Sequence, residues 1–315
     1  MFDVACVGIL VADAISRTVD GLPESGKLQL VDKIELYTGG CAVNAAIDMA
    51  RLGLNAAVIG KIGNDGFGKF MTAALRDEGV NAEGLRVDDT AGTSASIVAV
   101  DSGGERSFLH YLGANAEFGI DDIDYNIIKN SRMVFVAGTM LMPRFDGAQC
   151  AQFLKKVKEI GKYTVLDTAW DSRGRWMNVL GPCMKHIDLF IPSIEEAAML
   201  SGREKPEEAA DVFLSMGVKI AVIKLGKKGC FIKNSYGEKY QIPTYSKISA
   251  VDTTGAGDSF VAGFLTGLTK GWNLYECGKF ANAVGTHCIM AAGASTGIRS
   301  LEETLRFMEN NEIGG

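Results

Sequence analysis

The sequence lacks the patterns of nucleic-acid-binding, membrane-spanning and secreted proteins. Its 32 lysines and arginines form no basic block and are outnumbered by 38 aspartates and glutamates, which gives a net charge of −6 and argues against a nucleic-acid partner. No uninterrupted apolar run approaches the roughly 20 residues that a membrane-spanning helix needs. The first residues carry no basic region and no signal-peptide cleavage pattern. We therefore expect a soluble cytoplasmic protein with no nucleic-acid or membrane partner.

Disulfide and metal-cysteine patterns are missing as well. The seven cysteines are scattered, odd in number and contain no C-x-x-C motif, which favours reduced, mostly buried thiols over disulfides or a zinc site. The chain also has no internal repeat, low-complexity tract or linker. Its 47% hydrophobic content can fill a substantial core, and a length of 315 residues suits one large domain or two of ordinary size.

Apolar, β-branched runs alternate with segments of helical periodicity. The runs cover residues 4–9, 56–62, 133–136, 163–166, 187–191 and 220–225. The helical segments cover residues 42–52, 68–78, 149–160 and 206–216, and two rich in small residues follow at 258–269 and 274–291. This alternation predicts an α/β fold with a parallel sheet covered on both faces.

Two segments, residues 12–37 and 93–111, lack helical periodicity and predict hairpins. The second contains the turn signal DSGG at residues 101–104. We expect them to form a small β-structure inserted near the carboxyl ends of the early strands, where open α/β sheets bind their ligands. Such a structure would act as a lid.

The most informative stretch is residues 252–260, with the sequence DTTGAGDSF. Its glycines precede an apolar helical segment, so their backbone N–H groups would be free at a helix N-terminus and form an anion hole. A carboxylate there, Asp258, suits an enzyme that deprotonates a hydroxyl beside a highly charged group, as in phosphoryl transfer. The alternative is an acidic residue favoured only by the helix dipole.

A second glycine-rich element, Gly39 and Gly40, runs into a helical segment with Asn44 in its first turn. Paired glycines let the backbone approach a ligand closely. The alternative is an ordinary helix start with Asn44 on the polar face, because Asp48 and Arg51 follow at helical spacing.

Two nucleotide-binding motifs can be set aside. Residues 21–27 match G-x-x-x-x-G-K, but Leu28 replaces the metal-binding Ser or Thr and the segment lies in a predicted hairpin, so we interpret the match as incidental. No dinucleotide-binding G-x-G-x-x-G follows the first strand.

Together these features resemble the PfkB (ribokinase-like) carbohydrate kinases. Residues 39–44, with the glycines and the aspartate of residues 53–68, are similar to the family's N-terminal signature, and residues 252–258 are similar to its C-terminal signature. The resemblance covers essentially the whole chain. It implies one kinase domain over residues 1–315, a three-layer α/β/α fold with a mostly parallel sheet, and a small β-sheet lid formed by about 12–37 and 93–111. It also implies transfer of the γ-phosphoryl group of ATP to a sugar-like hydroxyl.

The resemblance assigns catalytic and substrate residues. Asp258 matches the family's general base, and its anion hole matches Gly255, Ala256 and Gly257. The implied substrate residues are Asp13, Gly39, Gly40, Asn44, Arg106, Tyr111 and Asn115. For Asp13 and Arg106 the alternatives are a solvated hairpin residue and a solvated turn residue.

Nucleotide and metal residues follow in the same way. Lys224, Gly226, Gly229 and Asn282 match the residues beside ATP, the alternatives being a plain hairpin turn and a buried helix asparagine. Glu196 matches a glutamate that organises Mg²⁺ through water, although Ser193 replaces the asparagine of that N-x-x-E motif and has a shorter reach. Asp252, Thr254 and residues 291–295, which include Ser295, resemble a K⁺ loop; the alternative is a simple helix-to-coil turn. ATP and Mg²⁺ are thus the implied cofactors, with K⁺ as an option.

Departures from ribokinase itself concern the acceptor. Ribokinases carry lysine where this chain has Cys41, and residues 167–171 lack the expected asparagine and proline. We therefore expect a sugar kinase other than ribokinase, with a nucleoside kinase or a catalytically silent sugar-binding regulator as alternatives. A sheet edge exposed in the lid often pairs with its like, and the resemblance implies a homodimer formed through the lid.

Overall fold

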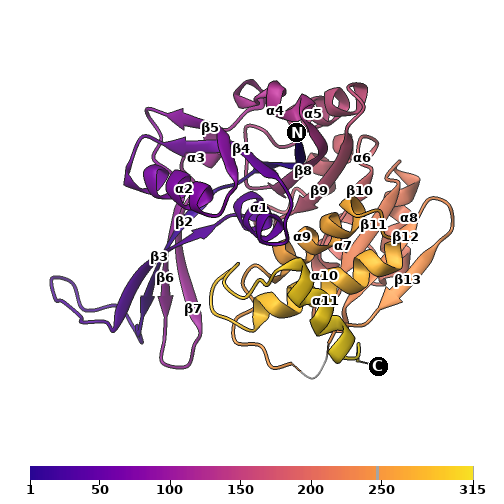
Figure 1. Cartoon of the computed structure of the whole chain (residues 1–315). Helices are drawn as coiled ribbons and strands as arrows, with labels where there is room; N and C mark the ends of the chain where they lie inside the picture. Colours follow the sequence, from indigo (N-terminus) through magenta and orange to yellow (C-terminus); the bar gives the residue numbers. More distant parts are fainter. Residues whose placement is uncertain (246–247, 315) are drawn as a thin grey trace.

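Two separate β-sheets organise the protein (Figure 1). The computed structural model describes residues 1–245 and 248–314, and the strands within these residues form a nine-stranded sheet and a four-stranded sheet. The large sheet has the order β13-β12-β11-β10-β9-β8-β1-β4-β5. Its strands are β1 (Phe2–Gly8), β4 (Ala56–Gly63), β5 (Asn81–Asp88), β8 (Ser131–Thr139), β9 (Tyr163–Thr168), β10 (Leu189–Phe190), β11 (Ile220–Lys224), β12 (Cys230–Asn234) and β13 (Lys239–Ile242).

Helices cover both faces of the large sheet, which confirms the three layers. Because strand side chains alternate between faces, Val4 and Cys6 of β1 pack into one core while Ala5 and Val7 pack into the other. The first core is covered by α1 (Cys41–Arg51), α2 (Gly66–Asp77), α9 (Ala256–Thr269), α10 (Leu274–Ile289) and α11 (Leu301–Asn310). The second is covered by α4 (Tyr125–Lys129), α5 (Ala148–Glu159), α6 (Met177–Met184), α7 (Ile194–Ser201) and α8 (Pro206–Ser215). The short helix α3 (Ala114–Glu117) contacts β4. The 3₁₀ turns are η1 (Ile120–Asp122) and η2 (Gly226–Lys228).

Each predicted apolar run overlaps a strand of the large sheet, although β10 covers only two residues of the run 187–191. The strands from β11 to β5 in the sheet order pair in parallel. The sequence interpretation missed β5, β12 and β13. Strand β5 lies at the edge, where buried and exposed residues alternate instead of forming a continuous apolar run. Strands β12 and β13 pair antiparallel at the opposite edge, which is why the sheet is mostly rather than entirely parallel.

The second sheet, called the small sheet from here on, has the order β3-β2-β6-β7 and projects from the body of the molecule (Figure 1). Its strands are β2 (Val11–Arg17), β3 (Lys33–Gly39), β6 (Ala95–Val100) and β7 (Arg106–Tyr111). The turn at residues 101–104 joins β6 to β7, as expected. The G-x-x-x-x-G-K stretch lies in the exposed connection from β2 to β3 and leads into a strand rather than a helix.

The cysteines and the helices can be compared with the expectations drawn from composition. All seven cysteines are free thiols, and all but Cys41 are buried. Among the helices in the described part of the chain, none combines the length and the apolarity needed to cross a membrane.

Candidate active site

The N-terminus of α9 has the form that an anion hole requires. Gly255 precedes the helix in the left-handed conformation with φ 77°, and a Cβ there would lie 2.5 Å from Ala294 O. Only glycine fits both demands. Ala256 N donates to Thr253 O at 3.3 Å, whereas the N–H groups of Gly255 and Gly257 have no partner among the residues that the structure describes. The backbone N–H groups of Gly255 and Gly257 are therefore the ones available to bind an anion.

The N-terminus of α1 meets that of α9. Gly40 precedes α1 with φ 91°, and a Cβ on it would lie 2.5 Å from Ile9 O, so the close approach again requires glycine. One turn later, Asn44 Nδ2 donates to Asp258 Oδ2 at 2.8 Å. Asn44 thus points toward the carboxylate of α9 rather than along a polar helix surface.

Asp258 lies in an environment suited to a base. Burial raises the pKa of this carboxyl, although the Asn44 hydrogen bond, the charge of Lys224 and the Cys41 thiol lower it. A raised pKa makes a carboxylate a stronger proton acceptor. Burial and the neighbouring Asp258 also hold the pKa of Cys41 well above its usual range, so the thiol keeps its proton and can donate to the carboxylate.

A buried ion pair lies beside the anion hole. Lys224, at the end of β11, approaches Asp167 of β9 with 2.5 Å between Nζ and Oδ2. Nζ would also lie 3.5 Å from a Cβ on Gly257, which places a positive charge next to the helix N-terminus. Burial raises the pKa of Asp167 to about 7, although Lys224 lowers it. Burial alone would lower the pKa of Lys224, but Asp167 and Glu196 outweigh it and raise that pKa.

One face of the small sheet presents polar groups near Gly39. Asp13 pairs in register with Ser96, and Ser96 pairs with His110, so the three side chains share a face. Ser96 Oγ lies 3.1 Å from His110 Nδ1. A Cβ on Gly39 would lie 2.2 Å from Asp13 Oδ2, so the absent side chain leaves room for the carboxylate. Burial raises the pKa of Asp13, while Ser96 and His110 lower it.

The sequence that forms these two helix starts can be compared with known families. The model of the pfkB family carbohydrate kinases matches residues 1–301. The chain belongs to the pfkB family of carbohydrate kinases. This confirms the family, the fold and the enzyme class, a phosphotransferase with an alcohol group as acceptor.

Relatives of this pfkB kinase differ in the acceptors that their names give. An uncharacterized sugar kinase of Archaeoglobus fulgidus is 32% identical over 251 residues, which cover 79% of this chain and 97% of that protein. The ATP-dependent 6-phosphofructokinase of Thermoanaerobacterium thermosaccharolyticum is 27% identical and covers 98% of this chain and 94% of its own length. The ribokinase of Arabidopsis thaliana, solved with ribose and ATP, covers 97% of this chain and 98% of its own, with a TM-score of 0.84 and 26% identity.

The residues expected beside ATP in this pfkB kinase fall into two groups. Lys224 faces the anion hole, as described above. Gly226 and Gly229 bound η2, and Leu225 N donates to Gly229 O at 2.8 Å in a tight turn between β11 and β12. Asn282 is buried in α10 and donates to Ile242 O at 3.1 Å and to Pro243 O at 3.2 Å. The amide of Asn282 therefore holds the backbone at the end of β13, which favours a structural role for this residue.

Glu196, which was expected to organise Mg²⁺, also takes part in capping the N-terminus of α7. Ser193 caps α7: its hydroxyl accepts from Glu196 N at 3.2 Å, and Glu196 Oε2 accepts from Ser193 N at 2.9 Å. This capping box explains how serine can stand at the asparagine position. Among the described residues, no group of three or more His, Cys, Asp or Glu could hold a metal ion.

The cation loop, residues 252–254 and 291–295, contains the residues that resemble a K⁺ site. Asp252 Oδ1 accepts from Thr254 N at 2.9 Å, and Oδ2 accepts from Gly293 N at 2.8 Å. The guanidinium of Arg106 also donates to Asp252 Oδ2 and to Thr254 Oγ1. The protein therefore matches the charge of the Asp252 carboxylate, while Ser295 Oγ is buried with no hydrogen-bond partner among the described residues.

Two predicted substrate residues have other surroundings. Tyr111 pairs in register with Ala95 and so faces away from His110 and Asp13; it lines an apolar hollow on the outer face of the small sheet. Asn115 is buried and pairs with Leu10, donating to Leu10 O at 2.9 Å and accepting from Leu10 N at 3.2 Å. Because side chains alternate along a strand, Tyr111 does not join the polar group of Asp13, Ser96 and His110, and its contact with a substrate stays a prediction. Asn115 instead fastens the connection between β1 and β2.

Sequence reasoning missed four polar residues around the site. Asp167 follows the predicted apolar run at residues 163–166 and lies at the carboxyl end of β9, a position that often carries function in α/β sheets, so this signal was available. Ser96 and His110 lie in two neighbouring strands, β6 and β7, whose sequences show no clear alternation of polar and apolar residues. Asp48 is fully buried between α1 and α9, where its Oδ2 accepts from Ser259 Oγ at 2.5 Å; its helical spacing from Asn44 had indicated a polar surface instead.

Proposed function

We propose that this protein is an ATP-dependent sugar kinase that transfers the γ-phosphoryl group of ATP to a hydroxyl of a monosaccharide or sugar derivative. Residues 1–315 would form one kinase domain, with the small sheet as its lid. The contact between Asn44 and Asp258 carries this proposal, because it joins the helix that follows Gly40 to the helix that carries the anion hole.

In the proposed reaction Asp258 acts as general base. Its Oδ2 is held by Asn44, and the carboxylate accepts the proton of the acceptor hydroxyl as that oxygen bonds to the γ-phosphorus. The bond from the γ-phosphorus to the bridging oxygen breaks, and the electron pair leaves with ADP. The N–H groups of Gly255 and Gly257 and the charge of Lys224 stabilise the charge on the phosphoryl oxygens, which is the main demand of this chemistry.

ATP and Mg²⁺ are the proposed cofactors. A buried lysine beside free helix N–H groups suits a polyphosphate, and the Arabidopsis ribokinase was solved with ATP. Mg²⁺ would neutralise the phosphates and keep several waters, one of them on Glu196. We propose no K⁺, for the reasons developed below.

On the acceptor side we propose Asp13, Gly39, Gly40 and Asn44 as the residues that hold the sugar. Carboxylate and amide groups suit vicinal hydroxyls, and Gly39 lets Asp13 come close to the backbone of β3. Arg106 points to the cation loop instead. A nucleoside kinase on the same fold stays a second candidate, because the polar face around Asp13 does not discriminate a free sugar from a ribosyl group.

A screen of acceptors tests the function. Purified enzyme with ATP and Mg²⁺ is offered monosaccharides, sugar phosphates and nucleosides, and ADP formation is measured. We expect turnover with a sugar or sugar derivative and its loss in Asp258→Asn. Turnover on nucleosides alone favours the second candidate. Thermal stabilisation by a sugar without any ADP formation favours a silent sugar-binding regulator.

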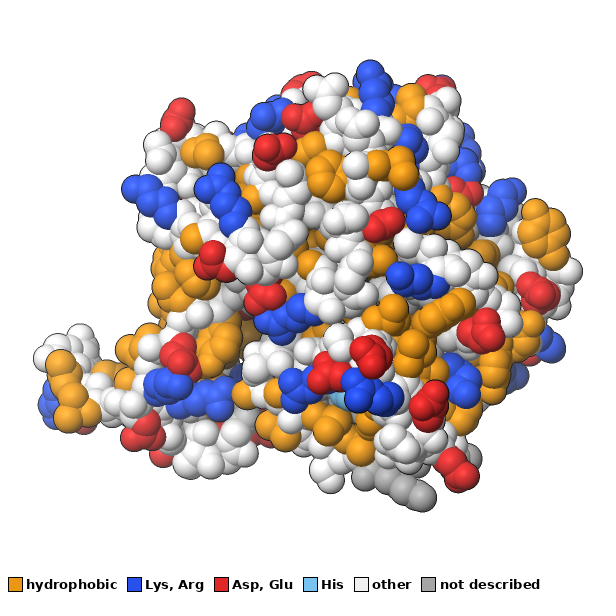
Figure 2. Space-filling view, in the orientation of Figure 1, with side chains coloured by type: hydrophobic (Ala, Val, Ile, Leu, Met, Phe, Trp, Pro, Cys, Tyr) orange, Lys and Arg blue, Asp and Glu red, His pale blue; other side chains and the backbone are white. Residues whose placement is uncertain are grey.

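We also propose a homodimer formed through the outer face of the small sheet. Five large apolar side chains on this face are between 45% and 67% exposed: Ile34, Leu36, Ile97, Leu109 and Tyr111. They lie on the face opposite Asp13, beside a hollow of about 450 Å³, and Figure 2 shows hydrophobic side chains over this part of the molecule. An apolar face of this kind marks an interaction site.

Light scattering tests the dimer. Ile97→Glu and Leu109→Glu should give monomers, because a charge on this face would have to be buried in the dimer. Val87→Glu, on the exposed edge strand β5, is the matched control and should remain dimeric. A monomeric native protein at micromolar concentration contradicts the proposal.

A further inference from the structure

The Asp252 carboxylate and some carbonyl groups of the cation loop already have donors from the protein, whereas Ser295 Oγ is buried with no hydrogen-bond partner among the described residues. Three donors serve the Asp252 carboxylate: Thr254 N, Gly293 N and the guanidinium of Arg106. Cys288 Sγ lies 3.3 Å from Thr254 O and 3.1 Å from Ala294 O, so its single proton is shared between these two carbonyl groups.

Two arginines reach this loop from different parts of the fold. Arg51 of α1 donates to Ser295 O and also pairs with Glu78, so its charge is matched outside the loop. Arg106 comes from β7 of the small sheet, its side chain is 19% exposed, and its ion-pair partner is Asp252, whose side chain is 4% exposed. Asp252 is the one carboxylate in residues 252–254 and 291–295. Arg106 therefore supplies the positive charge that this loop can balance.

We propose that Arg106 takes the place of a monovalent cation at the cation loop, so that this kinase works without K⁺ and holds its anion hole through the small sheet. An arginine is always charged and its two terminal nitrogens can bind two acceptors at once. Here those acceptors are Asp252 and Thr254, the residues that precede Gly255.

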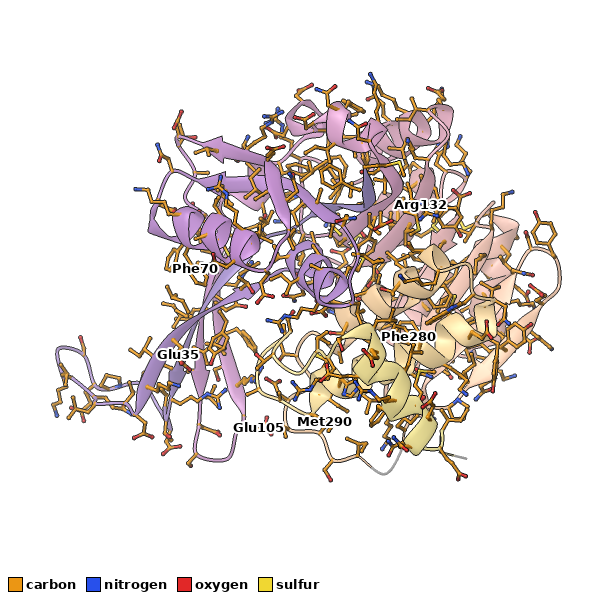
Figure 3. The ribbon with its side chains drawn as sticks, viewed as in Figure 1. Glu35, Phe70, Glu105, Arg132, Phe280 and Met290 are labelled. Carbon is orange, nitrogen blue, oxygen red and sulfur yellow. The ribbon has the colours of Figure 1, made fainter. Side chains whose placement is uncertain are left out.

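The position of Arg106 lets it act on the catalytic helix as a positioning residue. Figure 3 labels Glu105, beside Arg106 at the start of β7, and Met290, just after α10 and before the second part of the loop. The loop continues through Gly255 into α9, where Asp258 lies in the first turn. Fixing Asp252 and Thr254 therefore fixes the N–H groups of the anion hole. This inference concerns the loop and can be tested without knowledge of the acceptor.

Thermal unfolding without substrates is the first measurement. Native protein and Arg106→Met are unfolded in KCl, NaCl and N-methylglucamine chloride at equal ionic strength, since screening alone changes surface electrostatics. We expect the native midpoint to be the same in all three salts. Arg106→Met should have a lower midpoint in N-methylglucamine chloride and recover part of the loss in KCl, because the freed carboxylate can then take a cation.

Turnover is the second measurement. For Arg106→Met in N-methylglucamine chloride we expect kcat to fall at least about tenfold, the scale of one lost charge-assisted contact, and KCl to restore part of it. Arg106→Lys keeps the charge and should stay independent of K⁺. Arg86→Met, which removes an arginine of the exposed pair with Asp124, should behave as the native protein does.

The outcomes separate the proposal from its rivals. Activation or stabilisation of the native protein by K⁺ overturns it. So does an Arg106→Met variant that loses turnover with no response to K⁺ in either measurement, which would indicate a substrate contact or a purely structural residue. If Arg106→Lys depends on K⁺ as strongly as Arg106→Met does, the positive charge of Arg106 is not what makes the native protein independent of K⁺. Should Arg106→Met fail to fold, Arg106→Gln serves in its place. If the thermal midpoints behave as expected but no acceptor is turned over, the result supports the proposal for Arg106 and contradicts only the proposed kinase function.

Discussion

Asn44 Nδ2 donates a hydrogen bond to Asp258 Oδ2 at 2.8 Å, although 214 positions separate the two residues. The donor stabilises the charged form of the carboxylate and so lowers the pKa of Asp258, against the effect of burial. This contact ties the residue expected to hold the sugar to the residue expected to accept its proton.

Removing that donor should shift the pH dependence of catalysis. In Asn44→Ala the pKa of Asp258 rises, because the hydrogen bond that lowers it is gone. A base acts only when deprotonated, so the acidic limb of the kcat/KM profile should move to higher pH and kcat should fall at neutral pH. Asn55→Ala, an exposed asparagine before β4, is the control. An unshifted limb in Asn44→Ala would show that Asp258 is not the titrating base.

Substituting Asp258 itself should abolish most turnover. Loss of a general base commonly costs about 10²–10⁴-fold in rate, and Asp258→Asn keeps the size of the side chain. We expect kcat to fall on this scale, while ATP and sugar affinities measured by calorimetry change little. A kcat close to that of the native enzyme would remove Asp258 from the mechanism.

Breaking the buried pair should cost stability and activity by separate routes. Lys224→Met leaves Asp167 buried without its partner, and such changes cost about 3–5 kcal/mol; the Asp167 side chain is 3% exposed. Removing both charges in Asp167→Leu with Lys224→Met should restore much of the unfolding free energy measured in urea. Turnover should stay low in both variants, because Lys224 lies beside the anion hole. Recovery of turnover in the double variant would contradict a direct contact between Lys224 and phosphate.

Asp48 should make the protein less stable as pH rises. It is fully buried, and burial raises its pKa from 3.8 to about 7. Between these values the folded state binds more protons than the unfolded state, so stability falls with rising pH and is lowest above the folded pKa. A shift of this size corresponds to at most about 4 kcal/mol.

Asp48→Asn removes the charge but keeps an acceptor for Ser259, so it should be more stable than the native protein at pH 8, and this difference should be smaller at pH 5. The exposed Asp77→Asn is the control. Equal urea midpoints for native protein and Asp48→Asn at pH 8 would show that Asp48 is not a buried charge.

A matched pair of glycines isolates the anion hole. Gly255 and Gly271 have nearly the same φ, 77° and 78°, but a Cβ would lie 2.5 Å from Ala294 O at Gly255 and meets nothing within 4 Å at Gly271. Gly271→Ala should cost only the left-handed conformation, about 1–2 kcal/mol. Gly255→Ala should cost more in urea unfolding and should also lower kcat, because the N-terminus of α9 must move. Equal effects at both positions would contradict this account.

The sequence predicted what is local. Gly40 and Gly255 precede helical periodicity, and each is the glycine that its helix start requires, so the two motifs could be placed on helices before their contact was known. Which residues of β7 face the candidate active site could not be predicted. Its sequence RSFLHY puts an apolar residue on each face, so nothing distinguished His110, which shares a face with Asp13, from Tyr111, which faces away.

Contacts between distant segments were also beyond the sequence. The pair of Asp167 with Lys224 depends on β10 lying between β9 and β11. The reach of Arg106 to Asp252 depends on how the small sheet is set against the body, and a single sequence carries no signal for that. For the same reason Asp48, spaced like a surface residue, could not be recognised as one buried under α9.

The amide of Asn115 has a mechanical consequence. Only residues 9–10 separate β1 of the large sheet from β2 of the small sheet, and both main-chain groups of Leu10 are held by Asn115, which follows β7. The start of β2, which follows Leu10, and the end of β7, which precedes Asn115, are thus held together by these two hydrogen bonds. Sliding of the small sheet would break both bonds, whereas rotation about Leu10 keeps them. We therefore expect any movement of the small sheet against the large sheet to be a rotation about Leu10.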